Sequence, residues 1–198
     1  MLSKESAPLT SIFNQNKDSG FSIRHIYLGG TASSYFADNL RFVTPMNISD
    51  VPGLFKSRRL PINVALIQGS PPDDFGWMSL GISVDITMAA AYSADLVIAQ
   101  VNHRMPRIMG QSFIHVNDVN AIVEHDEELI SIDQGQPSEV ATMIGRNISR
   151  LIDDGSTLQV GLDAASQATV QALHQKNDLG FHSQYLTGDI MKLYAQGV

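Results

Sequence analysis

The chain of 198 residues contains no cysteine. Disulfide bridges, thiolate zinc sites and cysteine nucleophiles are therefore excluded. Basic residues are also few, since 13 Lys and Arg stand against 20 Asp and Glu and give a formal net charge of -7. Binding to the nucleic-acid phosphate backbone needs a basic surface, so this charge argues against a nucleic acid as a partner.

Long hydrophobic runs are missing as well. No run approaches membrane-spanning length, and residues 1–20 lack the apolar core of a signal peptide. We therefore expect no membrane segment and a cytoplasmic location. The 6 histidines show none of the paired spacing that places two imidazoles on one helix face, so no metal site is expected.

What is present is the composition of a globular protein, with 43% hydrophobic and 17% charged residues. Apolar runs alternate with amphipathic segments along the chain. Strands are expected at residues 23–28, 40–44, 64–68, 96–101, 121–124, 157–162 and 181–186, with a further extended segment at 77–84. Helices are expected at residues 51–56, 86–94, 164–174 and 190–195, and between Ser138 and Gly155.

Some of these segments carry more specific signals. The continuous apolar run at 64–68 favours burial of that strand on both faces. Asp50, Asp85 and Ser138 are expected to cap the helices that follow them. The helix after Ser138 has the clearest periodicity, because its apolar residues fall on one face; they are Val140, Ile144, Ile148, Leu151 and Ile152.

The alternation of strands and helices implies parallel pairing through right-handed crossovers. The expected fold class is therefore α/β, an open and mostly parallel sheet with flanking helices and with sites at the carboxyl ends of the strands. A polar connector at residues 126–137 is the one expected linker. It separates an N-terminal α/β domain at 1–125 from the start of a second α/β domain at 138–198.

Several blocks, taken in order, resemble one known family. They are LPINVALIQGSPPD at 60–73 with its continuation to Asp85, the segments 102–110 and 112–116, and the segments 144–146 and 151–159. These blocks are similar to the acetyl-CoA hydrolase and CoA-transferase family, of which butyrate and 4-hydroxybutyrate CoA-transferases are the nearest types. The resemblance runs from about residue 23 to residue 198. It implies the CoA-transferase-like form of the α/β fold (NagB/RpiA/CoA-transferase-like), with a second domain that is shortened relative to the family.

Members of this family, as the resemblance implies, move CoA from an acyl-CoA to a carboxylate or to water. A glutamate carboxylate attacks the thioester and becomes a glutamyl-CoA thioester, while backbone donors hold the oxyanions. The family pattern has this glutamate in a His-Ser-Glu or His-Thr-Glu context. Here the triplet at 182–184 ends in Gln184, an amide that cannot form the anhydride or the thioester.

The resemblance also implies a CoA-binding loop, in which two glycines flank one residue and a proline follows two residues later. The matching residues are Gly161, Leu162, Asp163, Ala164 and Ala165, with Ser166 in place of the proline. Asp163 replaces the second glycine and adds a negative charge where a helix start would favour an anionic ligand. Asp163 is either an ordinary N-cap or the mark of a lost CoA site, and the two interpretations are compatible.

A substrate pocket is expected in the loops that follow two buried strands. Its expected residues are Ser70, Gly76, Ser79, Gly81, Asn102, Arg107 and Gly110. Arg107 would pair with a substrate carboxylate through its planar guanidinium. The structural alternative is that the glycines and prolines fix turns and that Arg107 ties a loop to a neighbouring acid.

The sequence thus predicts a CoA-transferase-like protein of acetate metabolism with a degenerate active site, inactive as a transferase because of Gln184. CoA or an acyl-CoA is expected as its substrate or ligand, with no separate cofactor. One alternative is a weak acyl-CoA hydrolase, in which Gln184 and loop amides polarise the thioester for attack by water. Another is a non-catalytic subunit or scaffold that forms a homo-oligomer or pairs with a full-length relative.

Overall fold

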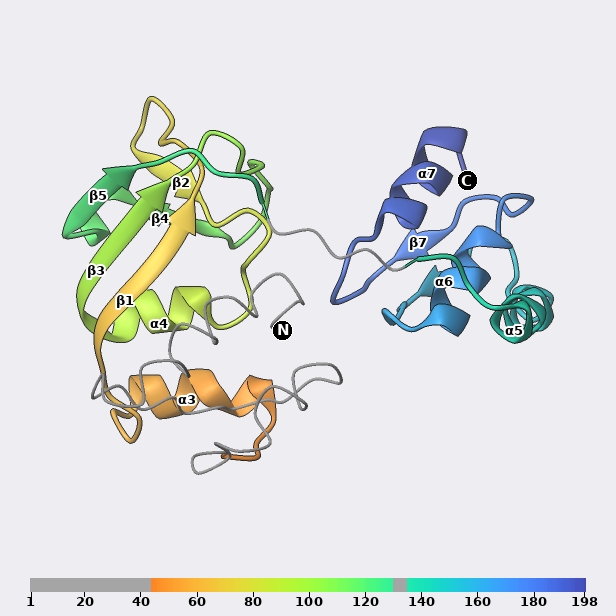
Figure 1. The fold of residues 1–198 in the computed structure, drawn as a ribbon, viewed down its shortest axis with the longest axis horizontal. Coiled ribbons are helices and arrows are strands. Elements are labelled where there is room, and N and C mark those ends of the chain that lie inside the picture. The colour runs from red at the N-terminus through yellow and green to blue at the C-terminus, as the bar shows by residue number, and fades with distance from the viewer. Residues whose placement is uncertain (1–43, 130–134) are drawn as a thin grey trace. The chain divides into compact units, whose positions relative to one another are not determined.

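The computed structural model describes residues 44–129 and 135–198. Two compact units divide the chain, unit 1 at Met1–Ser131 and unit 2 at Ile132–Val198 (Figure 1). The strand expected at 23–28, and all but Thr44 of the strand expected at 40–44, lie outside the described residues. The assignment of separate domains to 1–125 and 138–198 stays a prediction.

Unit 1 is built around a parallel sheet in the order β1-β3-β5. A second, antiparallel pair joins β2 to β4. The described elements of unit 1 are η4 (Ile48–Asp50), α3 (Val51–Lys56), β1 (Ile62–Gly69), β2 (Trp77–Ser79), α4 (Thr87–Ser93), β3 (Ala94–Val101), β4 (Phe113–His115), η5 (Val116–Asp118) and β5 (Ala121–Glu124). The predicted α/β class with a parallel sheet is confirmed.

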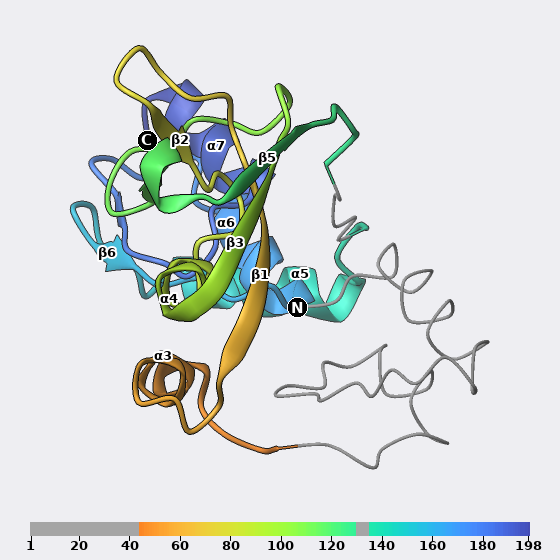
Figure 2. The same cartoon turned by 90° about the vertical axis from the view of Figure 1, so that its left-hand side faces the viewer.

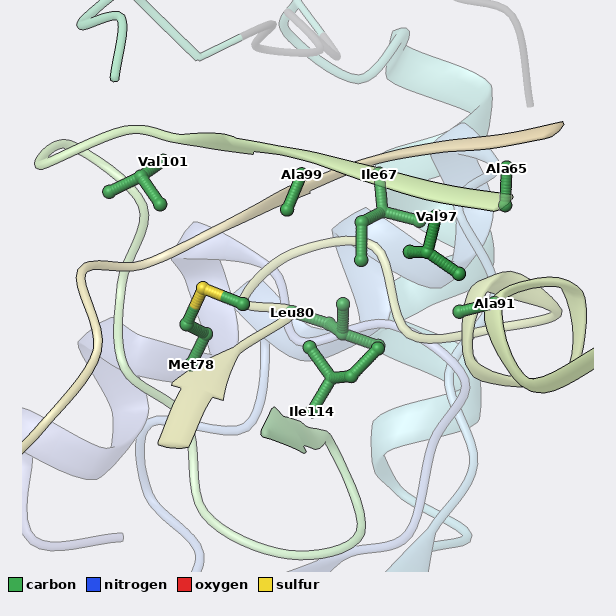
Figure 3. Packing of buried hydrophobic residues seen from close by; sticks show 9 residues of the cluster. All are labelled: Ala65, Ile67, Met78, Leu80, Ala91, Val97, Ala99, Val101 and Ile114. Carbon is green, nitrogen blue, oxygen red and sulfur yellow. The ribbon is translucent and has the colours of Figure 1, made fainter. Parts of the chain in front are cut away.

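The core of unit 1 lies on one face of this sheet. Figure 2 shows α4 and β2 on the same side of β1 and β3. Alternate strand residues point to that side, because successive side chains of a strand face opposite ways. The side chains that meet there are Ala65, Ile67, Val97, Ala99 and Val101 from the sheet, with Met78, Leu80, Ala91 and Ile114 packed against them (Figure 3).

The other face of the sheet is less covered than the continuous apolar run predicts. Val64 is 48% exposed, Leu66 77% and Leu96 38%. The expectation that the strand at 64–68 is buried on both faces is therefore wrong within the described residues. A run of apolar residues shows that both faces can be buried, but packing partners decide whether they are.

Four details of unit 1 depart from the sequence prediction. Asp50 makes no side-chain cap to α3. The helix α4 begins at Thr87 with Ile86 at the N-cap, although the Asp85 carboxylate accepts hydrogen bonds from the Ile86 N–H and the Thr87 hydroxyl. The extended segment expected at 77–84 ends at Ser79, because Gly81 turns the chain with a φ of 58°. The three-residue strand β4 was not predicted.

Unit 2 alternates helices with very short strands. Its described elements are α5 (Glu139–Ser149), β6 (Thr157–Leu158), α6 (Ala164–Gln171), β7 (Gly180–Phe181) and α7 (Gly188–Gln196). The pair β6 and β7 is parallel. Ser138 caps α5, since its hydroxyl accepts a hydrogen bond from the Ala141 N–H at 3.2 Å, and this prediction is confirmed.

The helix α5 packs on α6 through its small residues rather than its large apolar ones. Ala141 and Gly145 are buried. A Cβ atom on Gly145 would lie 2.5 Å from the carbonyl carbon of Ala168, so the two helices approach as closely as glycine allows. Most of the predicted apolar face is instead exposed, with Val140 of α5 at 61% and Leu151, just after the helix, at 83%. Ile152 is the exception, since it packs against the buried cluster of unit 2.

Replacing Gly145 by alanine should therefore destabilise unit 2. The added methyl group overpacks the α5–α6 contact at a cost of about 1–3 kcal/mol, which outweighs the roughly 1 kcal/mol that alanine gains in helix propensity. Thermal denaturation followed by circular dichroism should show a lower Tm. Gly53→Ala on α3 is the matched control, because a Cβ there meets no heavy atom within 4 Å. An equal rise of Tm in both variants would contradict the close packing.

Candidate functional site

The loops that leave β1 and β3 are joined at the carboxyl edge of the sheet. The Asn102 N–H donates to the Gly69 carbonyl at 3.0 Å, and the Ser70 N–H donates to the Ser79 carbonyl at 2.8 Å. Ser70, Ser79 and Asn102 are all buried. Parallel pairing places these loops together, so residues that are far apart in the sequence form one cluster.

The two serines of this cluster bind backbone groups of the loops. The Ser70 hydroxyl accepts from the Ser79 N–H at 2.9 Å and donates to the Pro71 carbonyl at 3.0 Å. The Ser79 hydroxyl accepts from the N–H groups of Gly81, at 3.2 Å, and Ile108, at 3.1 Å. Both hydroxyl groups are thus hydrogen-bonded to the backbone of the loops and stabilise them.

Asn102 and Gly81 also fix the conformation of these loops. The Asn102 side chain accepts from the Arg104 N–H at 2.9 Å and donates to the Glu127 carbonyl at 2.9 Å. Gly81 has a positive φ, and a Cβ there would collide with the Met105 side chain. Any larger residue at this position would therefore strain the backbone and force the Met105 side chain to move.

Arg107 already pairs with an acid of its own unit. It donates to the Asp73 carboxylate at 2.6 Å and to the Trp77 carbonyl at 3.0 Å, and its guanidinium carbon lies 4.6 Å from the centre of the Phe113 ring. The backbone N–H of Trp77 lowers the pKa of Asp73, and the Phe75 N–H and Arg107 lower it further. The sequence did not single out Asp73, although a polar residue in a proline-rich turn signals such a bond.

Gly76 and Gly110, also expected in the pocket, differ in their surroundings. Gly76 has a φ of 84° and lies against His115, whose Nε2 is 2.8 Å from the Phe75 carbonyl. His115 Nδ1 accepts from the Asn117 N–H at 3.1 Å, so Nε2 carries the proton and donates. Gly110 has no heavy atom within 4 Å of an added Cβ and is open to solvent.

The remaining candidate residues lie in unit 2, at the carboxyl ends of β6 and β7. The register pairs Leu158 with Phe181. Counting three residues on from each brings Gly161 and Gln184 to the same edge of this two-stranded sheet. Gln184 is exposed. The loop and the amide are therefore neighbours because the two strands run parallel.

Asp163 is the N-cap of α6. One oxygen of its carboxylate accepts from the N–H groups of Ala165 and Ser166, each at 3.0 Å, and the other accepts from the Ser166 hydroxyl at 2.6 Å. The Ser166 hydroxyl lowers the pKa of Asp163, and the Ser166 N–H lowers it further. A carboxylate of the chain itself thus occupies the helix terminus that would otherwise attract an anion.

The parallel strands define an open α/β protein. Its candidate residues lie in loops that follow the carboxyl ends of these strands, in unit 1 and in unit 2. The acetyl-CoA hydrolase/transferase N-terminal domain matches residues 30–133. The chain belongs to the acetyl-CoA hydrolase and CoA-transferase family, as the sequence motifs predicted.

Known proteins agree with this assignment. The chain is 43% identical to 4-hydroxybutyrate coenzyme A transferase of Clostridium kluyveri over 173 residues, which are 87% of this chain and 40% of that protein. The crystal structure of 4-hydroxybutyrate CoA-transferase from Porphyromonas gingivalis matches with a TM-score of 0.73 and 32% identity, over 96% of this chain and 49% of that one. RipA from Yersinia pestis matches with a TM-score of 0.80 and 28% identity, over 88% of this chain and 43% of that one. The chain thus spans less than half the length of these relatives.

The described residues show neither a metal site nor a membrane-spanning helix. No group of three or more histidine, aspartate or glutamate side chains in residues 44–129 and 135–198 is arranged to hold a metal ion. None of the helices in these ranges is long and apolar enough to cross a membrane. The cytoplasmic location stays a prediction.

The charge of Asp163 should stabilise unit 2 in a pH-dependent way. Asn caps helices about as well as Asp but carries no charge, so Asp163→Asn isolates the charge. The folded pKa of Asp163 lies below its ordinary value of 3.8, so its contribution is complete above that pH and is lost as pH falls through the folded pKa. We expect the free energy of unfolding at pH 7 to be about 0.5 kcal/mol higher for the wild type than for Asp163→Asn. This value is typical of a charge at an exposed helix end.

Thermal denaturation of the two proteins between about pH 7 and pH 2.5 tests this expectation, because other carboxylates affect both proteins alike and cancel in the difference. The gap should close at the acid end of the series. A gap of the same size at both ends would show that the carboxylate charge does not stabilise the cap.

Proposed function

We propose that the chain is a CoA-transferase-family protein that does not pass CoA through a covalent intermediate. The observation that carries the proposal is the amide of Gln184, which is exposed three residues beyond β7, as the loop at Gly161 lies three residues beyond β6. This is the position where the resemblance places a nucleophilic glutamate.

The chemistry of an amide explains why the intermediate cannot form there. In the covalent route a carboxylate oxygen attacks the acyl-CoA carbonyl and expels CoA thiolate, which leaves an acyl–glutamyl anhydride. The thiolate then attacks the glutamyl carbonyl and expels the acyl group as its carboxylate. A neutral amide is a poor nucleophile in the first step, and in the second the thiolate would have to expel an amide anion, which is a poor leaving group.

The cap of α6 supports the same proposal. CoA carries phosphate groups, and the N–H donors of Ala165 and Ser166 are already bound to Asp163. A phosphate approaching this terminus would meet a carboxylate instead of free donors, so repulsion replaces the attraction of the helix dipole. We therefore propose that any CoA or acyl-CoA bound by this chain is held without a phosphate at the α6 terminus.

In unit 1 we propose Arg107 as the residue that meets a substrate carboxylate. Its side chain is 40% exposed, and its five N–H groups exceed the two hydrogen bonds it makes to Asp73 and Trp77. Ser70, Ser79 and Asn102 support the pocket rather than contact the substrate, because they are buried and bound to loop backbone.

Mass spectrometry after incubation with acetyl-CoA or 4-hydroxybutyryl-CoA tests the proposal directly. No mass increase that corresponds to CoA is expected on the intact chain or on any of its peptides. The Clostridium kluyveri relative, treated in parallel, controls for reagent quality and for survival of a thioester during analysis. A CoA adduct on this chain, above all on the peptide that contains residue 184, would overturn the proposal.

A second candidate function, a non-catalytic subunit, is favoured by the apolar face of α5. Val140, Ile144 and Ile148 are exposed on this helix, and Leu151 is exposed just beyond its end. A solvent-exposed apolar stripe of this kind is typical of a protein–protein contact. As a subunit, the chain would associate with itself or with a family member of full length.

Light scattering coupled to size-exclusion chromatography tests this candidate, with the chain alone and mixed with the Clostridium kluyveri relative. A complex is expected that Ile148→Gln weakens, because the change places an amide within the apolar stripe. Arg146→Gln on the same helix should leave the complex unchanged. If the chain is monomeric and does not bind the relative at concentrations of about 100 μM, the subunit role is excluded.

A further inference from the structure

The hydroxyl of Ser183 lies just beyond the ends of the two strands of unit 2 and makes two hydrogen bonds to one residue. It donates to the Val160 carbonyl at 2.9 Å and accepts from the Val160 N–H at 3.2 Å. Both backbone groups of Val160 are thereby satisfied by a side chain from the neighbouring segment. One hydroxyl group, which both donates and accepts, thus replaces two backbone hydrogen bonds of a sheet.

The backbone hydrogen bonds on either side show what the hydroxyl replaces. The Gly180 N–H donates to the Ser156 carbonyl at 2.9 Å, and the His182 N–H donates to the Leu158 carbonyl at 3.0 Å. A regular parallel ladder would continue with Val160 bonded to the backbone of residues 182 and 184. Because Ser183 takes both places, the ladder stops and the strands β6 and β7 end at Leu158 and Phe181.

The end of the ladder coincides with the candidate site. Gly161 follows Val160 and begins the loop to Asp163, and Gln184 follows Ser183. The segments that follow β6 and β7 are therefore joined by the bonds between Val160 and Ser183. The next residue of each segment, Gly161 and Gln184, no longer belongs to the sheet. The carboxyl ends of parallel strands are where an α/β sheet opens a crevice.

We propose that Ser183 is a positioning residue, whose hydroxyl closes the β6–β7 ladder and so fixes where residue 184 lies beside the loop at Gly161. This proposal rests on the proposed function only in taking residue 184 and that loop as parts of one site. Ser183 itself does not contact a ligand in this scheme, because both polar functions of its hydroxyl are engaged with Val160.

Nuclear magnetic resonance on the ligand-free, ¹⁵N-labelled chain tests the positioning role with Ser183→Ala and Ser183→Thr. In the alanine variant the Val160 amide should exchange its hydrogen about tenfold faster, because its acceptor is gone. The resonances of the Gly161 N–H and of the Gln184 side-chain amide should shift at the same time. Threonine keeps the hydroxyl and suits extended backbone, so it should restore all three readouts.

Ser149→Ala is the matched control within unit 2. The Ser149 hydroxyl makes a single hydrogen bond, to the Arg146 carbonyl at 2.9 Å on α5. Its removal should leave Val160, Gly161 and Gln184 unchanged. A shift at these three residues in the control would mean that any loosening of unit 2 moves them, which would overturn a specific role for Ser183.

Two further outcomes would also overturn the proposal. Faster hydrogen exchange of the Val160 amide without any change in the resonances of Gly161 and Gln184 would show that the hydroxyl stabilises only Val160 and has no effect on the site. Failure of threonine to restore the signals would show that the hydroxyl is not the group responsible. None of these readouts uses CoA, so a CoA adduct on the chain would overturn the proposed function and leave this test intact.

Discussion

Parallel pairing of strands is the constraint on which both groups of candidate residues depend. In unit 1 it aligns β1 with β3, so that the loops after Gly69 and Val101 leave the sheet together. In unit 2 it aligns β6 with β7 and brings Gln184 to the edge from which the loop at Gly161 departs. Without this pairing the candidate residues would have no common location, because they are distant in the sequence.

The loops at these edges are held mainly by short polar side chains. Ser70, Ser79 and Asn102 bind backbone groups in unit 1, and Asp163 and Ser183 do so in unit 2. This satisfies buried and half-buried backbone groups where regular strand hydrogen bonds stop. It also limits the chemistry that remains, since a hydroxyl or carboxylate engaged in this way is not available to a ligand. Among the candidate residues, the exposed ones that keep donors to spare are Arg107 and Gln184.

The large apolar surfaces are the other unusual property of the described residues. One face of the β1-β3-β5 sheet and the periodic face of α5 both expose branched aliphatic side chains. Parallel sheets are normally covered on both faces, and amphipathic helices normally bury their apolar stripe. Exposed apolar surfaces of this kind are typical of protein–protein contacts.

The family could be predicted from the sequence, whereas the site role of Gln184 stays a prediction. The order of the motifs identified the family, and Gln184 cannot act as a carboxylate in any fold because that limit belongs to the side chain itself. Local signals also predicted several elements, including α3, β5 and the Ser138 cap of α5. These predictions succeed because the energies behind them come from residues within a few positions of one another.

Only the tertiary structure decided which surfaces and which partners these residues have. Val140 and Ile144 of α5 are exposed because the neighbouring face, which carries Ala141 and Gly145, is the one that packs against α6. Arg107 binds Asp73, 34 residues away, and Ser183 binds Val160 through a strand register that no local pattern encodes. Hydrogen bonds and close contacts between distant residues depend on how strands pair and helices cross, and composition and periodicity carry no record of that geometry.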